Sequence, residues 1–108
     1  MVHTPAQDWI KVQELKAVRL SQWSGVVTFP NHQHPRPILI YQYQGAYRAI
    51  ARYCPHQDYD LSGTEVLEGG IVRCQWHGLS ISILDDKSSY AVQKIAEDFY
   101  CLASHDRM

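Results

Sequence analysis

The sequence predicts a mostly β fold, a small antiparallel β-sandwich or barrel-like domain. Two observations support this prediction. Apolar β-branched and aromatic residues recur in runs of five or six, which are separated by glycine, proline or polar turns. One of these runs alternates with a period of two, which is typical of a strand with one buried face. With 108 residues, 45% hydrophobic and 19% charged, the chain is expected to form a single domain over residues 1–108.

The first candidate elements are an ambiguous segment and a loop. Residues 9–20 have apolar residues at a spacing that a helix could use, although the first four would also make a short strand. Residues 30–37 contain three prolines and are expected to interrupt either element. His32 and His34 within this loop are expected to lie on the surface.

Strands are predicted through the rest of the chain. Ile38–Tyr43 and Ala46–Ala51 flank a short glycine-containing connection and therefore predict a β-hairpin. Leu79–Ile83 is the alternating run. Tyr90–Ile95 and Phe99–Ala103 are two more candidate strands, joined by the polar turn Ala96-Glu97-Asp98.

Composition and charge exclude several classes of protein. Ten Lys and Arg residues against eleven Asp and Glu residues give a formal charge of -1, which does not favour nucleic-acid binding. The longest aliphatic-aromatic run, Ile38–Tyr41, is far shorter than the ~20 residues that span a bilayer. Residues 1–30 show no signal peptide. We therefore expect a soluble, cytoplasmic protein that binds neither nucleic acid nor a membrane.

Two short segments each combine a cysteine with a histidine. They are Cys54-Pro55-His56 and Cys74-Gln75-Trp76-His77-Gly78. In structural zinc sites, one segment usually supplies two cysteines and another supplies two histidines, whereas each segment here supplies one of each. The mixture suits a [2Fe-2S] cluster in which two thiolates hold one iron and two imidazoles hold the other. A zinc-stabilised interaction module is the alternative.

At these residues the sequence resembles the Rieske iron–sulfur family, whose pattern is C-x-H followed by C-x-x-H. The resemblance covers residues 38–84 well and extends more weakly over the whole chain. Outside the four ligands it rests on Leu61, Gly63, Glu68-Gly69-Gly70, Trp76, Gly78 and the strand from Ile81. It implies a Rieske domain whose cluster-binding tip is formed by two loops, at about residues 54–63 and 74–80.

The resemblance also implies a role for each ligand. Cys54 and Cys74 would hold the inner iron, and His56 and His77 would hold the outer iron with their second ring nitrogens exposed. Neutral imidazoles would raise the reduction potential above that of an all-cysteine ferredoxin, into the range of about −150 to +300 mV. Cys101 is expected to be a buried thiol and not a fifth ligand.

Departures from the respiratory members of the family indicate a low potential within that range. Those members carry one extra cysteine in each loop, where this chain has Tyr59 and Trp76, so no disulfide is expected between the loops. They also carry two hydroxyls that bond to the cluster sulfurs, where this chain has Leu79 and Ile81. The pattern is similar to that of the ferredoxins that serve oxygenases.

Other residues near the two segments bear on docking. Asp58 stands where the family usually has glycine, and its charge would make the cluster harder to reduce and favour basic partners. Residues 85–89 stand in place of a proline-containing third loop, so a more exposed cluster is expected. Four acids and one base, Arg73, lie between the two cysteines. The acids form either a collar that steers the cluster toward basic partners or an ordinary solvated surface. They are Asp58, Asp60, Glu65 and Glu68.

The sequence therefore predicts an electron-transfer component that is not itself an enzyme. It would pass single electrons from an NAD(P)H-dependent flavin reductase to a terminal oxygenase, docking transiently as a monomer. An alternative is the small Rieske-like subunit of an NADH-dependent nitrite reductase. A catalytic oxygenase is disfavoured because the chain is too short for a second, mononuclear iron site.

Overall fold

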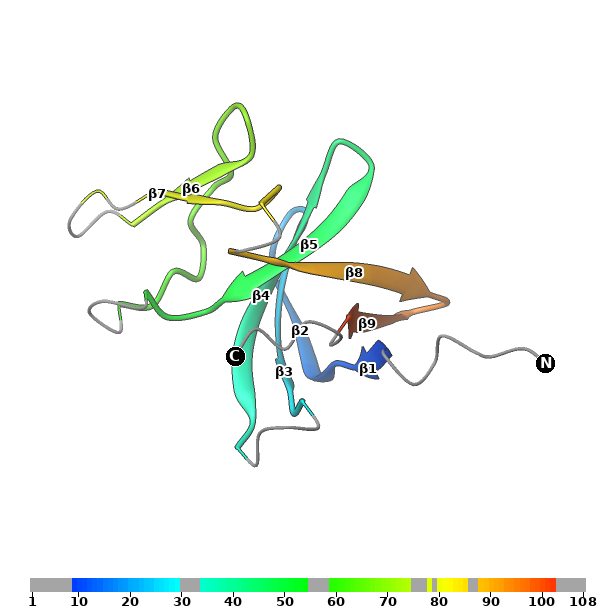
Figure 1. The fold of residues 1–108 in the computed structure, drawn as a ribbon. Helices are drawn as coiled ribbons and strands as arrows, with labels where there is room; N and C mark the ends of the chain where they lie inside the picture. The colour runs from blue at the N-terminus through cyan, green and yellow to red at the C-terminus, as the bar shows by residue number, and fades with distance from the viewer. Residues whose placement is uncertain are drawn as a thin grey trace.

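Antiparallel strands provide the regular structure of the chain. The computed structural model describes residues 9–29, 34–54, 59–74, 78, 80–85 and 88–102, and these ranges contain nine strands and no helix (Figure 1). The strands are β1 (Trp9–Lys11), β2 (Gln13–Arg19), β3 (Gln22–Val27), β4 (Arg36–Tyr43), β5 (Ala46–Ala51), β6 (Ile71–Arg73), β7 (Ser80–Ser82), β8 (Tyr90–Ile95) and β9 (Asp98–Leu102). The described part of the chain accordingly has no helix that could cross a membrane. The predicted mostly β fold class is confirmed.

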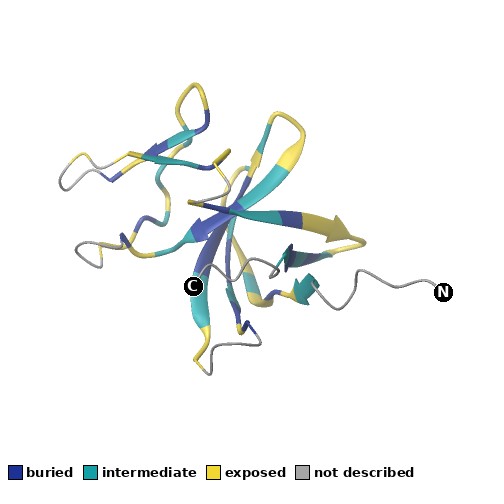
Figure 2. Ribbon diagram, in the orientation of Figure 1, coloured by how far each residue is buried: buried dark blue, intermediate teal, exposed yellow. Residues whose placement is uncertain are grey.

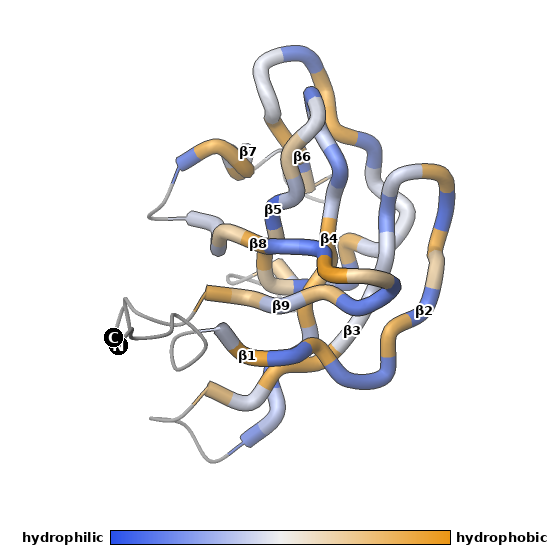
Figure 3. Tube along the Cα trace, turned by 90° about the vertical axis from the view of Figure 1, so that its right-hand side faces the viewer, coloured by the Kyte–Doolittle hydropathy of each residue, from blue (hydrophilic) through white to orange (hydrophobic). Residues whose placement is uncertain are grey.

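Seven of the strands form one curled sheet. Their order is β1-β9-β8-β5-β4-β3-β2, so the first two strands of the chain lie at opposite edges. Only Val12 separates β1 from β2 in the sequence. Because one residue spans less than about 4 Å, the sheet must curl until its two edges approach each other. Figure 3, a quarter turn from Figure 1, shows β8, β9 and β1 in succession, with β2 and β3 beside them.

Val12 connects the two edge strands and contacts the strand beside each edge. Its amide donates to the carbonyl oxygen of Phe99 on β9 at 2.9 Å. Its side chain is 4% exposed and occupies the space beside Gly25 on β3, where an added Cβ would collide with Val12 Cγ1. Glycine at position 25 therefore lets the two edges meet.

Strand β4 separates two apolar cores, which explains its uninterrupted apolar run. Ile38 and Ile40 belong to the core inside the curled sheet, which we call the barrel core. Leu39 and Tyr41 point to the opposite face and belong to a second core, the loop core, which extends under β6 and β7. Figure 2 shows β4 among the most buried parts of the ribbon. A strand covered on both faces is apolar at successive positions instead of alternating ones.

The predicted elements in the first half are largely as observed. The ambiguous residues 9–20 form strands, not a helix. The hairpin around Gln44-Gly45 is confirmed, with positive φ angles at both turn residues as a tight two-residue turn requires. Strand β4 begins at Arg36, so the loop predicted at 30–37 ends two residues earlier than expected. Pro37 is tolerated there because it lies at the start of the strand.

The predicted elements in the second half differ from the structure mainly at their ends. The alternating run at 79–83 forms only the short β7, which among the described residues pairs with β6, and Leu79 lies outside the described residues. Strand β8 has its predicted bounds. Strand β9 includes Asp98, which was assigned to the turn, because Asp98 pairs with Ile95 across a two-residue connection.

Two strands had no counterpart in the prediction. Strand β3 contains polar Gln22 and Ser24 and the glycine at position 25, which obscure its apolar pattern, yet all three are buried. Strand β6 has only three residues, Ile71–Arg73, and depends on β7 for its pairing. Strand β3 pairs with the preceding β2 and with β4, and its polar residues hid it from the period-two pattern.

Candidate metal centre

The first cysteine segment begins a hairpin loop that extends β5. Tyr53 and Asp60 form an antiparallel bridge across the neck of this loop. Within that neck, the amide of Cys54 donates to the carbonyl oxygen of Tyr59 at 2.8 Å, and the amide of Leu61 donates to the carbonyl oxygen of Arg52 at 2.8 Å. Cys54 is therefore the first residue inside a loop whose two ends are held together.

The second cysteine segment begins a loop of the same kind, between β6 and β7. Arg73 pairs with Ser80 at the ends of the two strands. The amide of Gly78 donates to the carbonyl oxygen of Cys74 at 2.7 Å, which closes the turn. Gly78 has a φ of 72°, a conformation that side-chain-bearing residues rarely adopt. The glycine of this segment thus has a conformational reason to be there.

The structure places both cysteines in the loop core. Cys54 and Cys74 are each 0% exposed, in one buried cluster with Ile50, Leu61 and Val72. His56 and His77 lie outside the described residues. The described residues contain no group of three or more His, Cys, Asp or Glu side chains able to hold a metal ion, so a metal centre here needs ligands from the remainder of the two loops.

Cys101 occupies a different environment. It is also 0% exposed, but it belongs to the barrel core and pairs through its backbone with Ile10 and Val92. Its placement on the other side of β4 agrees with the prediction of a buried thiol that is not a ligand. His34, the one described histidine of the 30–37 loop, is exposed as expected.

The chemistry of the donor set fits an iron–sulfur cluster. Two buried thiols that begin adjoining hairpin loops can hold the inner side of one centre as thiolates. The loop core around them keeps water from that side, which protects thiolate–iron bonds and lowers the local dielectric. The outer ligands must come from residues farther along each loop.

An ion pair holds the neck of the first loop. Arg52 Nε and Nη2 donate to the two carboxylate oxygens of Asp60, each at 3.1 Å. The amide and the hydroxyl of Ser62 also donate to Asp60, at 2.9 and 2.7 Å. These hydrogen bonds, above all those from Arg52, lower the pKa of Asp60 to about 2. The guanidinium also lies 5.5 Å from the ring centre of Tyr53.

The chain leaving the first loop is bound to the main sheet by a buried amide. Gln22 is 1% exposed; its oxygen accepts from the Gly63 amide at 2.8 Å, and its nitrogen donates to the Thr64 carbonyl oxygen at 3.0 Å. Tyr41 donates its hydroxyl to the same carbonyl oxygen at 3.0 Å. Burial raises the pKa of Tyr41 to about 12, so the hydroxyl keeps its proton and remains a donor.

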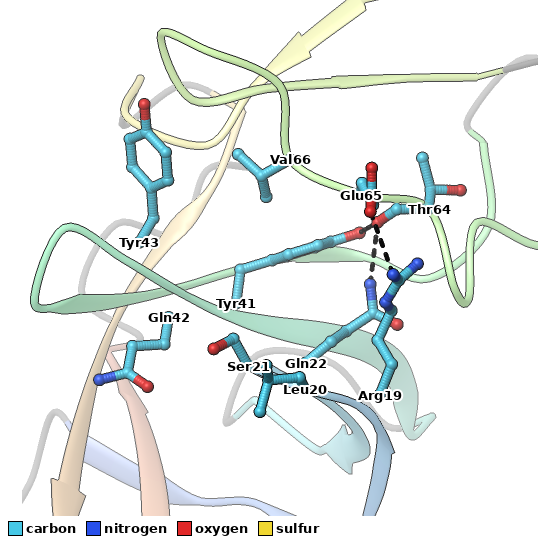
Figure 4. Close-up of a pocket in the computed structure, with 10 residues that line it drawn as sticks. All are labelled: Arg19, Leu20, Ser21, Gln22, Tyr41, Gln42, Tyr43, Thr64, Glu65 and Val66. Carbon is cyan, nitrogen blue, oxygen red and sulfur yellow. Dashed lines mark hydrogen bonds and ion pairs between the residues drawn. The ribbon is translucent and has the colours of Figure 1, made fainter.

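A surface cavity of about 370 Å³ lies beside this contact (Figure 4). Several of its side chains are engaged in hydrogen bonds: Arg19 donates to the Gly63 carbonyl oxygen at 2.7 Å and to the Glu65 carboxylate at 3.1 Å. The cavity is therefore the outer side of the junction between loop and sheet.

The predicted acidic collar is partly neutralised. Two of its four carboxylates are paired with arginines from outside the segment, Asp60 with Arg52 and Glu65 with Arg19. Glu68 is exposed, and Asp58 lies outside the described residues. These pairs favour the reading of an ordinary solvated surface over that of a collar that steers partners.

Sequence reasoning did not identify the residues that hold the loops to the sheet. Gln22 and Arg19 contact residues more than forty positions away in the chain, and no local pattern marks such a pair. Polar residues next to apolar ones in β3 were the available signal.

Comparison with known proteins agrees with this geometry. The chain matches the family described as Rieske [2Fe-2S] domain over residues 8–95. No curated protein and no solved structure matched it. The matched range includes both cysteine loops and most of the curled sheet, and the domain binds a [2Fe-2S] cluster that transfers electrons. The chain belongs to the Rieske [2Fe-2S] domain family.

Proposed function

We propose that this protein is a one-electron carrier whose [2Fe-2S] cluster is held by Cys54 and Cys74 on the inner iron and by His56 and His77 on the outer iron. One observation carries the proposal. Both cysteines are fully buried in the same core, each as the first residue of a hairpin loop. When bound, the cluster supplies one-electron redox chemistry with the potential range given by mixed thiolate and imidazole ligation.

The residues of the chain hold and shield this centre. The loop core keeps water away from the cysteine side, and the hydrogen-bonded necks fix where each cysteine begins its loop. The two histidines would stand farther along their loops, on the side from which a partner approaches. We place all four ligands within one domain spanning residues 1–108.

The partners we propose are a flavin-dependent NAD(P)H reductase and a terminal oxygenase, met in turn by a monomeric, cytoplasmic carrier. The absence of the extra cysteines at Tyr59 and Trp76, and of hydroxyls at Leu79 and Ile81, supports a low-potential carrier of this kind. The chain has three cysteines, all of them described, and they form no disulfide. This supports a protein that works in a reducing compartment.

The first experiment tests the ligand set. Purified protein should contain two irons and two acid-labile sulfides per chain, and dithionite reduction should produce the EPR signal of a reduced Rieske cluster. His77→Ala should lose that signal. His34→Ala, which changes an exposed histidine of another loop, is the control and should retain it. Stoichiometric zinc without sulfide, or a native signal in His77→Ala, would disprove the assignment.

The second experiment tests the origin of the low potential. Leu79→Ser introduces a hydroxyl where the high-potential members have one. We expect the reduction potential to rise by roughly 20–60 mV, equivalent to a hydrogen bond of about 0.5–1.5 kcal/mol. Leu79→Ala is the control without a donor. Equal potentials in the serine and alanine variants would contradict this explanation.

The role as a free shuttle is tested by purification and kinetics. A shuttle purifies alone and accepts electrons from a reductase in successive encounters. A chain that purifies only with a large partner would instead be a permanent subunit, as in an NADH-dependent nitrite reductase.

A further inference from the structure

The two cysteine loops are carried by different sheets. Cys54 follows β5 of the seven-stranded sheet, whereas Cys74 follows β6 of the two-stranded sheet. Among the described residues, no strand pairing joins β6 or β7 to the larger sheet. Apolar packing in the loop core brings the sheets together, but packing alone permits sliding. A cluster with ligands from both loops needs their separation to be fixed.

Arg48 joins the two sheets with a fork of hydrogen bonds. It lies on β5, six residues before Cys54, and its neighbours across β4 place it on the face of Ile50, toward the loop core. Its Nε donates to the carbonyl oxygen of Ile83 at 2.8 Å, and its Nη2 donates to the hydroxyl oxygen of Ser89 at 2.8 Å. Ile83 is the first residue after β7.

Ser89 completes a compact network at the same place. Its hydroxyl lies 2.7 Å from the carbonyl oxygen of Ile83 and 3.0 Å from that of Asp85, and Ser89 is 3% exposed. The Ile83 carbonyl oxygen thus has two donors within reach, the guanidinium and the hydroxyl. The amide of Ile83 donates to the carbonyl oxygen of Gly70, the residue before β6, at 2.8 Å.

Ile83 transmits this attachment to the cluster side. Its side chain is 0% exposed and belongs to the same buried cluster as Cys54 and Cys74. The strand that leads into Cys54 is therefore bonded, through Arg48, to a residue of the buried cluster that contains Cys74. One strand supports the first loop through the main chain and the second loop through a planar guanidinium.

We propose that Arg48 is a positioning residue that sets the separation of the two cysteine loops and thereby the geometry of the cluster. This inference rests on the proposed function. Arg48 acts through Ile83 and Ser89 and does not touch the cluster. The planar fork, with two donors in fixed directions, is the feature that matters, because a single ammonium cannot bond to both partners in the same geometry.

The test compares Arg48→Lys with a variant that weakens the fold elsewhere. In the cluster-loaded protein, Arg48→Lys should shift the g-values of the reduced EPR signal and speed cluster loss roughly tenfold, as expected from the loss of a charged hydrogen bond. Val92→Ala removes buried side-chain atoms from the barrel core and serves as the control. It should lower thermal stability while leaving the g-values unchanged.

Ser89→Ala keeps the inference testable if Arg48→Lys does not fold. Ser89→Ala removes the hydroxyl without altering β5 and should shift the g-values in the same direction as Arg48→Lys, by a smaller amount. Ser89→Thr retains the hydroxyl and should have wild-type g-values. Wild-type g-values in Arg48→Lys or in Ser89→Ala would overturn the inference, as would an equal shift in Val92→Ala. A wild-type protein that holds zinc and no sulfide would overturn the proposed function as well, so the two failures are distinguishable.

Discussion

Gln22 is a polar side chain inside an apolar environment, and both ends of its amide are bonded. Its oxygen and nitrogen meet the backbone of Gly63 and Thr64 in the way that a neighbouring strand would. A buried polar group is tolerated when its hydrogen bonds are complete, and it then favours one arrangement of the chain over others. Here the arrangement is the exit of the first cysteine loop.

Replacing Gln22 should therefore lower the stability of the fold more than the change in side-chain volume alone would. Gln22→Leu keeps the volume but leaves the Gly63 amide without its acceptor, and we expect a loss of about 1–3 kcal/mol in the free energy of unfolding. Urea denaturation measures this loss. Gln42→Leu, at an exposed position of β4, is the matched control and should change stability by less than about 0.5 kcal/mol. Equal losses would refute the bonding argument.

Ala96 occupies a backbone conformation that favours glycine. Its φ is 57° in the turn between β8 and β9, where an L-residue with a Cβ is strained. Ala96→Gly should raise the free energy of unfolding by about 0.5–1 kcal/mol, because the strain relieved exceeds the entropy lost. Ala46→Gly in β5, which has no positive φ, should instead lower it. Thermal denaturation of both variants measures the contrast, and a destabilised Ala96→Gly would count against it.

At the scale of elements, ion pairing strengthens the neck of the first loop. Asp60 bonds to Arg52 across the strand ends and to Ser62 beyond them, so one carboxylate joins both sides of the neck. The side chain of Asp60 is 44% exposed, so solvent screening reduces the stabilisation to about 0.5–1 kcal/mol.

The pH dependence of this stabilisation follows from the lowered pKa. Asp60 has a folded-state pKa of about 2 against an ordinary value of 3.8. The carboxylate therefore stabilises the fold fully above about pH 4, and the contribution is lost as pH falls toward 2. Asp60→Asn should be less stable than the wild type at pH 6, with the difference vanishing near pH 2, as measured by urea denaturation. A difference independent of pH would contradict the role of the charge, and Glu97→Gln controls for the loss of one surface charge.

At the scale of the whole molecule, the curl of the sheet depends on the close approach of Val12 to Gly25. Val12 connects the two edge strands and fills the space that Gly25 leaves open. A larger residue at position 25 would force apart the edges that the single-residue connection brings together. The shape of the barrel core therefore depends on the absence of a side chain at one position of β3.

Gly25→Ala should destabilise the protein by about 1–3 kcal/mol, the usual cost of overpacking. The double variant Val12→Ala/Gly25→Ala should lose less stability than the sum of the two single variants, because the smaller side chain at position 12 makes room for the new methyl group. Additive losses, measured by denaturation of all three variants, would mean that the contact does not limit the curl.

The sequence was informative wherever the determinants were local. The hairpin at Gln44-Gly45 follows from turn chemistry, and the mixed cysteine and histidine segments indicated the family from their spacing alone. Strand β3 was not predicted because the side chain of Gln22, which makes the strand look polar, finds its partner Thr64 far along the chain. Strand β6 was not predicted because three residues are too few to show a pattern. The outcome for His56 and His77 stays a prediction, since both lie outside the described residues.

What the sequence determined by itself is the strand-rich fold class and the pair of cysteine segments, since both depend on residue type and spacing over a few positions. What only the tertiary structure decided is how the two loops are held: both cysteines in one core, acids neutralised by Arg52 and Arg19, and a guanidinium from β5 bonded to the chain after β7. The physical reason is range. Turn and strand preferences act between neighbours, whereas burial, ion pairing and the fork of Arg48 arise only once the curled sheet has brought distant residues together.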